Sequence, residues 1–284
     1  MQTFLVLGGT GTTGRRIARR LRASGHPVRT ASRSGGDVHF DLGDPASWAP
    51  ALDSVRAAYL MEPDLRPGAD RHERLPRLVA GAVAAGVRRL VLLSAHGVGE
   101  AGDDHPLKAA EQAVRESGVE WTVLQPGWFA QNFSETFWLP GIEAGNLALP
   151  AGDGRTPFID AEDIADVAVA ALTAGAGHNG QTYQLTGPRP LGFAEAVERI
   201  ATATGRPISY TPIAPEAYLE LLTAQGTPPA VARIFTNLLI DIREGRGITV
   251  SDGVERALAR PPRSFEDFVA GSRLSRNPRT PRRP

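Results

Sequence analysis

A run of glycines and threonines, GGTGTTG, occupies residues 8–14. The apolar residues 4–7 before it predict a buried strand, and Ile17 and Leu21 after it predict the inner face of a helix. Free N–H groups and the helix dipole make such a helix N-terminus an anion site, and glycine permits close approach of a pyrophosphate. A plain strand-to-helix turn is the alternative. The residues expected to contact the ligand are Gly8, Thr10, Gly11, Thr12, Thr13 and Gly14.

The residues after the second predicted strand indicate which phosphates can be bound. Residues 28–31 predict this strand, and Ser32 and Arg33 follow it directly. In a dinucleotide-binding fold an acidic residue here binds a ribose of NAD, whereas a basic residue pairs with the 2′-phosphate of NADP. A guanidinium offers a planar pair of donors and keeps its charge. Ser32 and Arg33 therefore predict NADP(H); a solvated loop arginine is the alternative.

Further candidates lie where other predicted strands end. Asp41 and Leu42 follow the short strand 38–40, and Asp41 is a candidate acceptor for an adenine amino group. Asp44, before Pro45, fits a helix N-cap instead. Ligands of parallel α/β sheets lie outside the carboxyl ends of the strands, so these ends should converge. The other residues expected at the cofactor from these ends are Met61, Pro63, Ser94 and Pro126.

Aromatic residues are concentrated after the strand predicted at 120–125. Trp128 and Phe129 are favoured as walls of a substrate pocket at the nicotinamide end of the cofactor. Phe133 and Phe137 fit a pocket wall and core packing equally well. The predicted substrate pocket consists of Trp128, Phe129, Asn132 and Phe133.

Strands and helices must alternate to position these residues. Strands apolar on both faces, separated by helices of ten or more residues, predict a doubly wound parallel α/β sheet of the Rossmann type. The strands are predicted at 4–7, 28–31, 38–40, 56–61, 89–94, 120–125 and 181–186. The clearest helices are predicted at 75–86, 105–117 and 193–204, with a further helix capped by Asp160.

The regular alternation breaks after residue 126, which suggests two domains. Residues 1–126 and 155–186 are predicted to form the dinucleotide-binding domain. Residues 127–154 and 187–274 are predicted to form a small C-terminal substrate or lid domain. Residues 275–284, rich in Pro and Arg, are expected to be disordered, with contact to nucleic acid as the alternative.

The composition excludes several classes of site. The 284-residue chain has no cysteine and six dispersed histidines, so neither disulfides nor a metal site is expected. Zero net charge gives no field toward nucleic acid or an anionic membrane. Without an export signal or an apolar run of about 18 residues, a cytoplasmic protein is expected. Lys108 is the only lysine.

With these residues in place, the chain resembles the NmrA-like group of atypical short-chain dehydrogenases/reductases. Within that group it is similar to bacterial relatives of ergot-alkaloid iminium reductases and of NADPH quinone and azo reductases. The resemblance implies a Rossmann core that binds NADP(H), and it leaves a homodimer open. It rests on GGTGTTG (8–14), ASR (31–33), RLVLLSA (89–95), SGVEWTVLQPGWFAQNF (117–133), PFIDAEDIADVAVAAL (157–172), YQLTGP (183–188) and RPPRSFEDFV (260–269).

The resemblance also implies where catalytic groups lie. Short-chain dehydrogenases use a serine and a tyrosine four residues before a lysine, which lowers the pKa of the phenol. Ser94 and Lys108 stand at the expected places, but Asp104 occupies the place of the tyrosine. Standard ketone chemistry is therefore not expected. Lys108 binds the nicotinamide ribose, as its counterpart does, or is a surface lysine.

Two routes remain without this tyrosine. An iminium or activated quinone accepts hydride without simultaneous protonation, so positioning and exclusion of water suffice. Alternatively, a proton comes from Tyr59, His96 or His105. His96 is preferred because imidazole exchanges protons near neutral pH, although it also fits an exposed loop histidine.

The leading functional hypothesis is an NADPH-dependent reductase of a small apolar or aromatic electrophile, such as an imine, quinone or enone. A non-catalytic NADP(H) sensor that regulates partners is a second hypothesis. A cofactor-retaining isomerase or cyclase is a third.

Overall fold

The computed structural model describes residues 3–64, 71–103, 105–173 and 176–275, which form two compact units. Asp104 and residues 276–284, and with them the expected disordered tail apart from Ser275, lie outside the described residues. The first unit comprises Met1–Gly127, Ala161–Leu185 and Asp252–Pro261. The second comprises Trp128–Asp160, Thr186–Ser251 and Pro262–Pro284.

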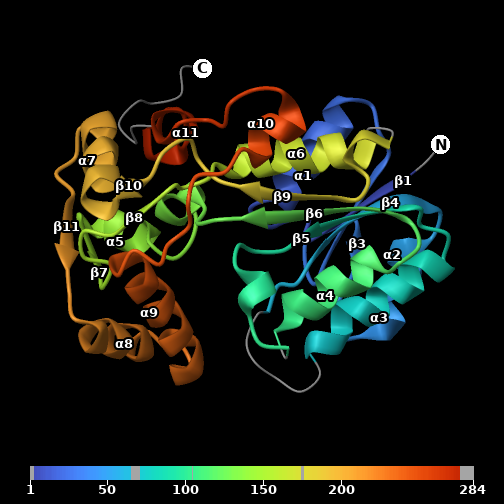
Figure 1. Cartoon of the computed structure of the whole chain (residues 1–284), viewed down its shortest axis with the longest axis horizontal. Helices are drawn as coiled ribbons and strands as arrows, with labels where there is room; N and C mark the ends of the chain where they lie inside the picture. The colour runs from blue at the N-terminus through green and yellow to red at the C-terminus, as the bar shows by residue number, and fades with distance from the viewer. Residues whose placement is uncertain (1–2, 65–70, 104, 174–175, 276–284) are drawn as a thin grey trace. The chain divides into compact units, whose positions relative to one another are not determined.

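A seven-stranded parallel sheet organises the first unit (Figure 1). The chain builds outward from β1 to one edge through β2 and β3, then returns to β4 and builds toward the other edge. The doubly wound fold predicted from the sequence is thus confirmed. In spatial order the strands are β3 (Val38–His39), β2 (Val28–Ser32), β1 (Thr3–Leu7), β4 (Val55–Met61), β5 (Arg89–Leu93), β6 (Glu120–Pro126) and β9 (Gln181–Leu185).

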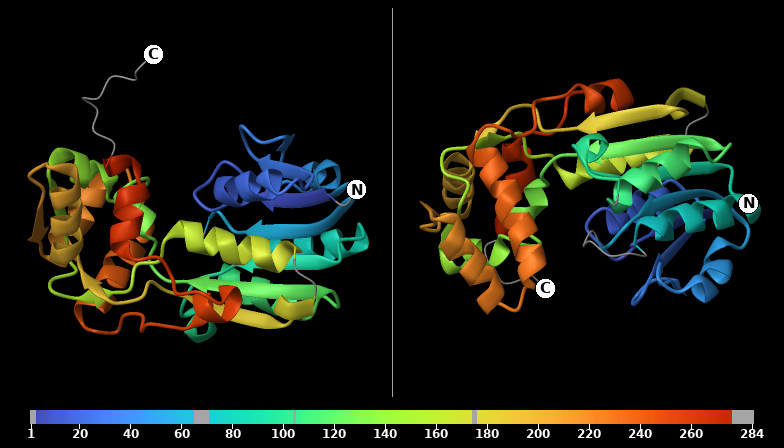
Figure 2. Two further views of the ribbon diagram at one scale, coloured as in Figure 1. Left: turned by 90° about the horizontal axis from the view of Figure 1, so that it is seen from above. Right: turned by 60° about the horizontal axis from the view of Figure 1, so that its bottom comes forward.

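Helices cover both faces of this sheet (Figures 1 and 2). On one face α1 (Gly14–Ala23) packs beside α6 (Ala161–Thr173), which in turn contacts α10 (Gly253–Leu258). The other face is covered by α2 (Trp48–Leu52), α3 (Arg71–Ala84) and α4 (Pro106–Arg115). Short 3-10 helices occupy Pro45–Ser47, Val98–Glu100 and Ala176–His178. The coverage explains why the strands are apolar on both faces.

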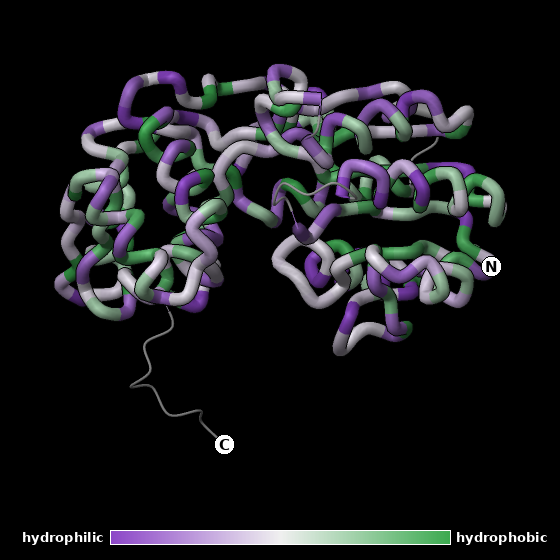
Figure 3. Tube along the Cα trace, turned by 90° about the horizontal axis from the view of Figure 1, so that it is seen from below, coloured by the Kyte–Doolittle hydropathy of each residue, from purple (hydrophilic) through white to green (hydrophobic). Residues whose placement is uncertain are grey.

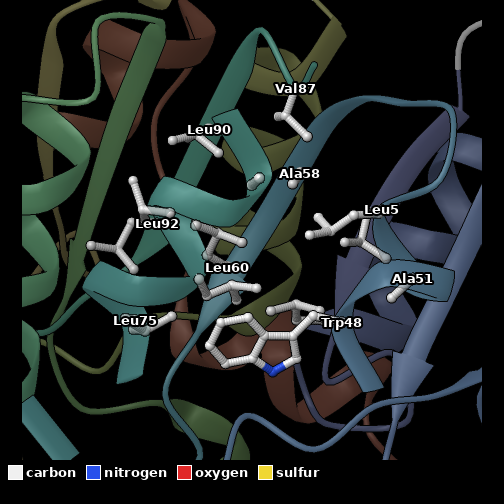
Figure 4. Close-up of a cluster of buried hydrophobic side chains, with 14 of the residues drawn as sticks. Leu5, Trp48, Ala51, Ala58, Leu60, Leu75, Val87, Leu90 and Leu92 are labelled. Carbon is white, nitrogen blue, oxygen red and sulfur yellow. The ribbon is translucent and has the colours of Figure 1, made fainter. Parts of the chain in front are cut away.

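Alternation along each strand divides the apolar side chains between the two faces. Leu5 and Leu7 of β1 belong to the core under α2, α3 and α4, together with Leu60 of β4 and Leu92 of β5. Figure 4 shows Trp48 of α2 and Leu75 of α3 beside this strand surface. The helices change between hydrophilic and hydrophobic residues along their length, as helices with one buried face do (Figure 3).

Ion pairs join α1, α6 and the segment after α10. Glu162 of α6 accepts from Arg16 Nε at 2.7 Å, and Arg20 Nε donates to Asp166 at 2.5 Å. Arg260 Nη2 lies 2.7 Å from Asp163 and 2.6 Å from Asp166. Because the Asp163 side chain is fully buried, the Arg260 guanidinium compensates a charge that would otherwise be costly.

The second unit has two small sheets and an aromatic core. β7 (Asn146–Leu149) pairs in parallel with β11 (Ser209–Pro212), and β8 (Arg155–Thr156) pairs antiparallel with β10 (Leu191–Gly192). These four strands were not predicted, because segments of two to four residues carry almost no periodicity. The helices are α5 (Leu139–Ala144), α7 (Phe193–Thr204), α8 (Pro215–Ala224), α9 (Pro229–Arg243) and α11 (Phe265–Gly271), with 3-10 turns at Ala130–Phe133 and Arg273–Ser275.

Apart from the single residues Gly127 and Thr186 at the boundaries, the division of the chain differs from the predicted one in two segments. Residues 155–160 belong to the second unit rather than to the dinucleotide-binding unit. Residues 252–261 belong to the first unit, although they were assigned to the substrate domain. Gly253 packs so closely on β9 that a Cβ would lie 1.8 Å from the Gln184 carbonyl oxygen. This backbone contact and the Arg260 ion pairs hold the segment to the first unit.

Replacing Arg260 with alanine should destabilise the first unit. The change leaves the buried Asp163 without this cation, and we expect a loss of about 2 kcal/mol, less than in a fully buried pair because Arg260 is 35% exposed. Calorimetry should show a thermal midpoint lowered by roughly 4–8 °C. The control is Arg22→Ala, which removes an ion pair between half-exposed side chains. Equal shifts in both variants would contradict the structural role of Arg260.

Candidate functional site

The glycine loop joins β1 to α1 in a tightly closed turn. Gly8 has a left-handed backbone, with φ of 62°, and its carbonyl oxygen accepts from Gly11 N–H at 2.8 Å. A Cβ at Gly14 would lie 2.2 Å from that same carbonyl oxygen, and a Cβ at Gly9 would lie 2.4 Å from Thr30 Cβ. Glycine is therefore required by the packing of the loop itself at these positions.

The closed loop leaves donors for an anion. Within the described residues, the backbone N–H groups of Thr12, Thr13 and Gly14 donate no hydrogen bond, and Thr13 makes no side-chain cap to α1. These groups lie at the positive end of the α1 dipole. Thr10 and Gly11 are exposed. Open donors on a glycine cradle fit a pyrophosphate, so the loop can hold the phosphates of a dinucleotide.

Tyr59 holds this loop from beneath. Its side chain on β4 is fully buried, and its hydroxyl donates to Thr13 Oγ1 at 2.9 Å. Burial raises the pKa of the Tyr59 phenol, which therefore stays neutral. The sequence analysis named Tyr59 as a candidate proton donor. Its burial and its bond to Thr13 make it a candidate positioning residue for the glycine loop instead.

Arg33 lies beside the glycine loop with its guanidinium exposed. No ion pair or side-chain hydrogen bond of Arg33 occurs in the described part of the chain. A Cβ at Gly35 would lie 3.4 Å from the Thr10 side chain, so the turn after β2 borders the loop. Ser32 Oγ donates to the Ser34 carbonyl at 2.5 Å and thereby shapes the turn that presents Arg33. The arrangement suits a phosphate next to the pyrophosphate.

The loop after β3 is built around Asp41. Asp41 Oδ1 accepts from Gly43 N–H at 2.8 Å, and the Asp41 carbonyl accepts from the Trp48 indole at 3.0 Å. Asp44 caps the following 3-10 helix by accepting from Ala46 N–H, as its position before a proline predicted. The Leu42 side chain belongs to the core, so a cofactor contact at this candidate would have to come from its backbone.

The end of β4 lies against the glycine loop. Met61 Sδ lies 3.1 Å from the place that a Cβ of Gly8 would take, so Met61 packs on the first glycine. Pro63 is exposed, whereas Glu62 between them is buried. The order of the strands reverses between β1 and β4, and ligands bind at such a reversal. Met61 and Pro63 remain candidates for cofactor contact.

Ser94 takes part in a buried network that the sequence analysis missed. Its hydroxyl donates to Glu111 Oε1, which also accepts from Gln125 Nε2 at 2.8 Å, while Arg115 pairs with Glu111 Oε2 at 2.7 Å. Glu111 and Ser94 are both buried. The proton of the hydroxyl is therefore engaged, and only the lone pairs of Ser94 are left for a substrate. A carboxylate on the apolar face of α4, in register with Leu107 and Val114, was the available signal.

Lys108 and His105 have local partners at the start of α4. Lys108 Nζ donates to the Ala101 carbonyl at 2.8 Å and to Asp103 at 2.9 Å, and this hydrogen bond lowers the pKa of Asp103. His105 Nδ1 accepts from Leu107 N–H and caps the helix, so this nitrogen already has a structural role. To bind the nicotinamide ribose, Lys108 would have to exchange its hydrogen bonds to Ala101 and Asp103 for bonds to the ribose.

His96 has a polar atom with no partner. Its backbone N–H donates to the Pro126 carbonyl at 3.0 Å, which ties the loop after β5 to the end of β6. The ring is partly exposed, and its Nδ1 is buried without a hydrogen bond to any described residue. Buried polar atoms are nearly always paired, so an unpaired ring nitrogen at the strand ends suits a ligand contact.

The predicted pocket residues of the second unit have different surroundings. Trp128 is partly buried and stacks on Trp138 at 5.4 Å, and Phe129 is partly exposed. Asn132 Oδ1 accepts from Thr136 at 2.9 Å. Phe133 is fully buried among the rings of Trp138, Phe158, Phe193 and Phe265. Phe133 is thus a core residue, which corrects its assignment to the pocket, while Trp128 and Phe129 stay candidates.

The described residues lack two further classes of feature. No group of three or more histidine and carboxylate side chains there could hold a metal ion. In that same part of the chain, no helix is long and apolar enough to cross a bilayer.

Removing the Tyr59 hydroxyl tests its positioning role. In Tyr59→Phe the glycine loop loses one buried hydrogen bond of about 1 kcal/mol, so NADPH affinity should fall about fivefold while maximal turnover is kept. Fluorescence titration and steady-state kinetics separate the two effects. Tyr210→Phe deletes a similar hydroxyl in the second unit and serves as control. Lost turnover with unchanged affinity would instead identify Tyr59 as a proton donor.

Comparisons with known proteins agree with this geometry. A family described as NAD(P)H-binding matches residues 8–174. The uncharacterized oxidoreductase YesF of Bacillus subtilis is 38% identical over 279 residues, 94% of each chain. The NAD(P)H azoreductase of Xenophilus azovorans is 33% identical and covers 94% of this chain and 96% of its own.

Solved structures agree on the fold. Triphenylmethane reductase of Citrobacter sp., solved with NADP(H), matches 96% of this chain and 100% of its own with a TM-score of 0.74. At 19% identity this likeness shows the fold alone. The family predicted from the sequence motifs is confirmed by the family match and the two sequence relatives. This chain belongs to the family of NAD(P)H-binding oxidoreductases.

Proposed function

We propose that the protein is an NADPH-dependent reductase that delivers hydride to a small apolar or aromatic electrophile. Imines, iminium ions, quinones and enones are the proposed substrate classes. The observation that carries the proposal is the distribution of hydrogen-bond partners among the candidate catalytic residues. Ser94, Lys108 and Tyr59 are bonded to other groups, whereas His96 Nδ1 has no partner among the described residues. Such a site favours substrates that need little proton transfer.

The cofactor preference follows from charge. A bound NADPH supplies the hydride for the reduction. The N–H groups of the glycine loop would hold its pyrophosphate, and the exposed guanidinium of Arg33 would pair with its 2′-phosphate. No carboxylate stands at the end of β2 to favour the ribose hydroxyls of NADH.

The substrate preference follows from the proton donors that the chain lacks. Asp104 stands where related dehydrogenases carry a tyrosine, so no phenol is available at that position. His96 is the candidate to give a proton to the reduced substrate, and Trp128 and Phe129 are candidates for contact with an aromatic group. The relative from Xenophilus azovorans is named an azoreductase, which supports an electrophile with a multiple bond to nitrogen.

Turnover of a substrate panel tests the proposal. We expect NADPH absorbance to fall with at least one iminium, quinone, enone or azo compound. Binding of NADPH without oxidation by any class would favour the sensor hypothesis. A rearranged product formed without NADPH consumption would favour the isomerase or cyclase.

His96→Gln refines this test. The variant should slow substrates whose product must gain a proton at the accepting atom, and it should leave iminium reduction nearly unchanged. His26→Gln, which alters a ring packed on Phe4, is the control. Unchanged rates with every substrate would remove His96 from the reaction.

Arg33→Ala tests the cofactor preference. Loss of charge-assisted hydrogen bonds of about 1.5–3 kcal/mol should weaken NADPH binding roughly 10- to 100-fold and leave NADH nearly unchanged. Calorimetric titration of both cofactors gives the ratio. Arg88→Ala is a matched control, because Arg88 is also exposed but precedes β5 at the opposite end of the sheet. Equal weakening of NADPH and NADH would contradict the proposed position of the 2′-phosphate.

A further inference from the structure

A buried carboxylate, Glu62, follows β4 at the reversal of strand order. Glu62 is only 6% exposed, although the neighbouring Pro63 is exposed. Glu62 Oε1 accepts from Asp64 N–H at 3.0 Å. Glu62 Oε2 is buried and has no hydrogen-bond partner among the described residues. One oxygen of this side chain is therefore bonded and the other is unpaired.

The position of Glu62 relates it to the glycine loop. β4 is the neighbour of β1 in the sheet, with Val6 opposite Tyr59. Met61, which precedes Glu62, packs on Gly8. Tyr59, two residues before Met61, donates a hydrogen bond to Thr13. Glu62 is thus the next residue along a strand end that already supports the loop.

The charges around Glu62 do not explain its burial. Burial raises the pKa of Glu62, and the charge of Asp64 raises it further. The hydrogen bond from Asp64 N–H and the charges of Arg74 and Arg71 lower this pKa, but the net shift is upward. A carboxyl whose pKa is raised in the folded state contributes to the stability of the fold at low pH. This contribution is lost as the pH rises above the ordinary pKa of the carboxyl. The ionised side chain consequently destabilises the free protein near neutral pH.

A group that costs stability in the free protein is often retained for a ligand. An ionised carboxylate only accepts hydrogen bonds, so it cannot pair with phosphate oxygens. The donors of a dinucleotide are its ribose hydroxyls and its amino groups. Asp41 is already the candidate for the adenine amino group, and the end of β2 has Ser32 and Arg33 where a ribose-binding carboxylate would stand.

We propose that Glu62 is a cofactor-binding residue whose Oε2 accepts a hydrogen bond from a ribose hydroxyl of the bound dinucleotide. The proposal rests on the proposed function only for the identity of the cofactor. In it, the carboxylate that binds ribose is supplied by the end of β4 instead of the end of β2. Binding of the hydroxyl pairs the open oxygen, so cofactor binding relieves the cost of burial.

The variants Glu62→Gln and Glu62→Ala test this role by two measurements, the thermal midpoint of the free protein and the affinity for NADPH. The thermal midpoint of the free protein should stay the same or rise in Glu62→Gln, because a buried charge is removed and the acceptor for Asp64 N–H is kept. Calorimetric titration should show NADPH affinity reduced about tenfold in Glu62→Gln and more in Glu62→Ala. Glu73→Gln, at an exposed glutamate on α3, is the matched control and should change neither quantity.

Fragments show which ribose is bound. If Glu62 binds the adenosine ribose, Glu62→Ala weakens 2′,5′-ADP and leaves nicotinamide mononucleotide unchanged; the reverse pattern assigns the nicotinamide ribose. Loss of NADPH affinity with neither fragment affected overturns the ribose assignment.

Other outcomes overturn the proposal as a whole. A lower midpoint of the free protein with unchanged NADPH affinity would make Glu62 a structural residue. Failure of the wild type to bind NADPH would overturn both this proposal and the proposed function. If the wild type binds NADPH but reduces no substrate, only the proposed function fails, because the Glu62 measurements need binding alone.

Discussion

The contact between Gly14 and the carbonyl oxygen of Gly8 is the constraint on which the nucleotide-binding unit depends. It brings the first residue of α1 so close to the end of β1 that a Cβ would lie 2.2 Å from that oxygen. The direction of α1 is thereby set, and with it the positions of Arg16 and Arg20, which pair with α6. The same closure leaves the N–H groups of Thr12, Thr13 and Gly14 for an anion. One backbone contact thus links the candidate phosphate site to the packing of two helices.

The strand ends around this loop differ in how fully their polar groups are bonded. Ser94, Glu111, Gln125 and Arg115 form a closed network, and Tyr59 and Thr13 form a closed pair. Arg33, His96 Nδ1 and Glu62 Oε2 have no such partner among the described residues. Closed networks rigidify a site, whereas an exposed cation such as Arg33 and buried unpaired atoms such as those of His96 and Glu62 are open to a ligand. The division separates the supporting residues from the candidate contacts.

The sheet was predictable because each strand is a buried apolar run that ends at a turn signal. The helix from Phe193 to Thr204 was predicted with its bounds, since its apolar face is regular and Gly205 takes the left-handed C-cap. Tyr59, Leu42 and Phe133 were placed at the site, yet they are supporting or core residues. Side-chain direction within a strand or turn decides between these roles, and no local pattern reports it. Glu62 and Glu111 were missed because a lone carboxylate in an apolar segment resembles an exposed one.

Because residues 252–261 belong to the first unit, neither unit is encoded by one continuous stretch of the gene. Each unit consists of three separate segments that alternate along the chain. No single cut therefore releases either unit as a continuous polypeptide. The late segment also carries Arg260, the partner of the buried Asp163 in α6. Exchange of one contiguous stretch that spans the whole second unit would therefore remove part of the nucleotide-binding unit with it.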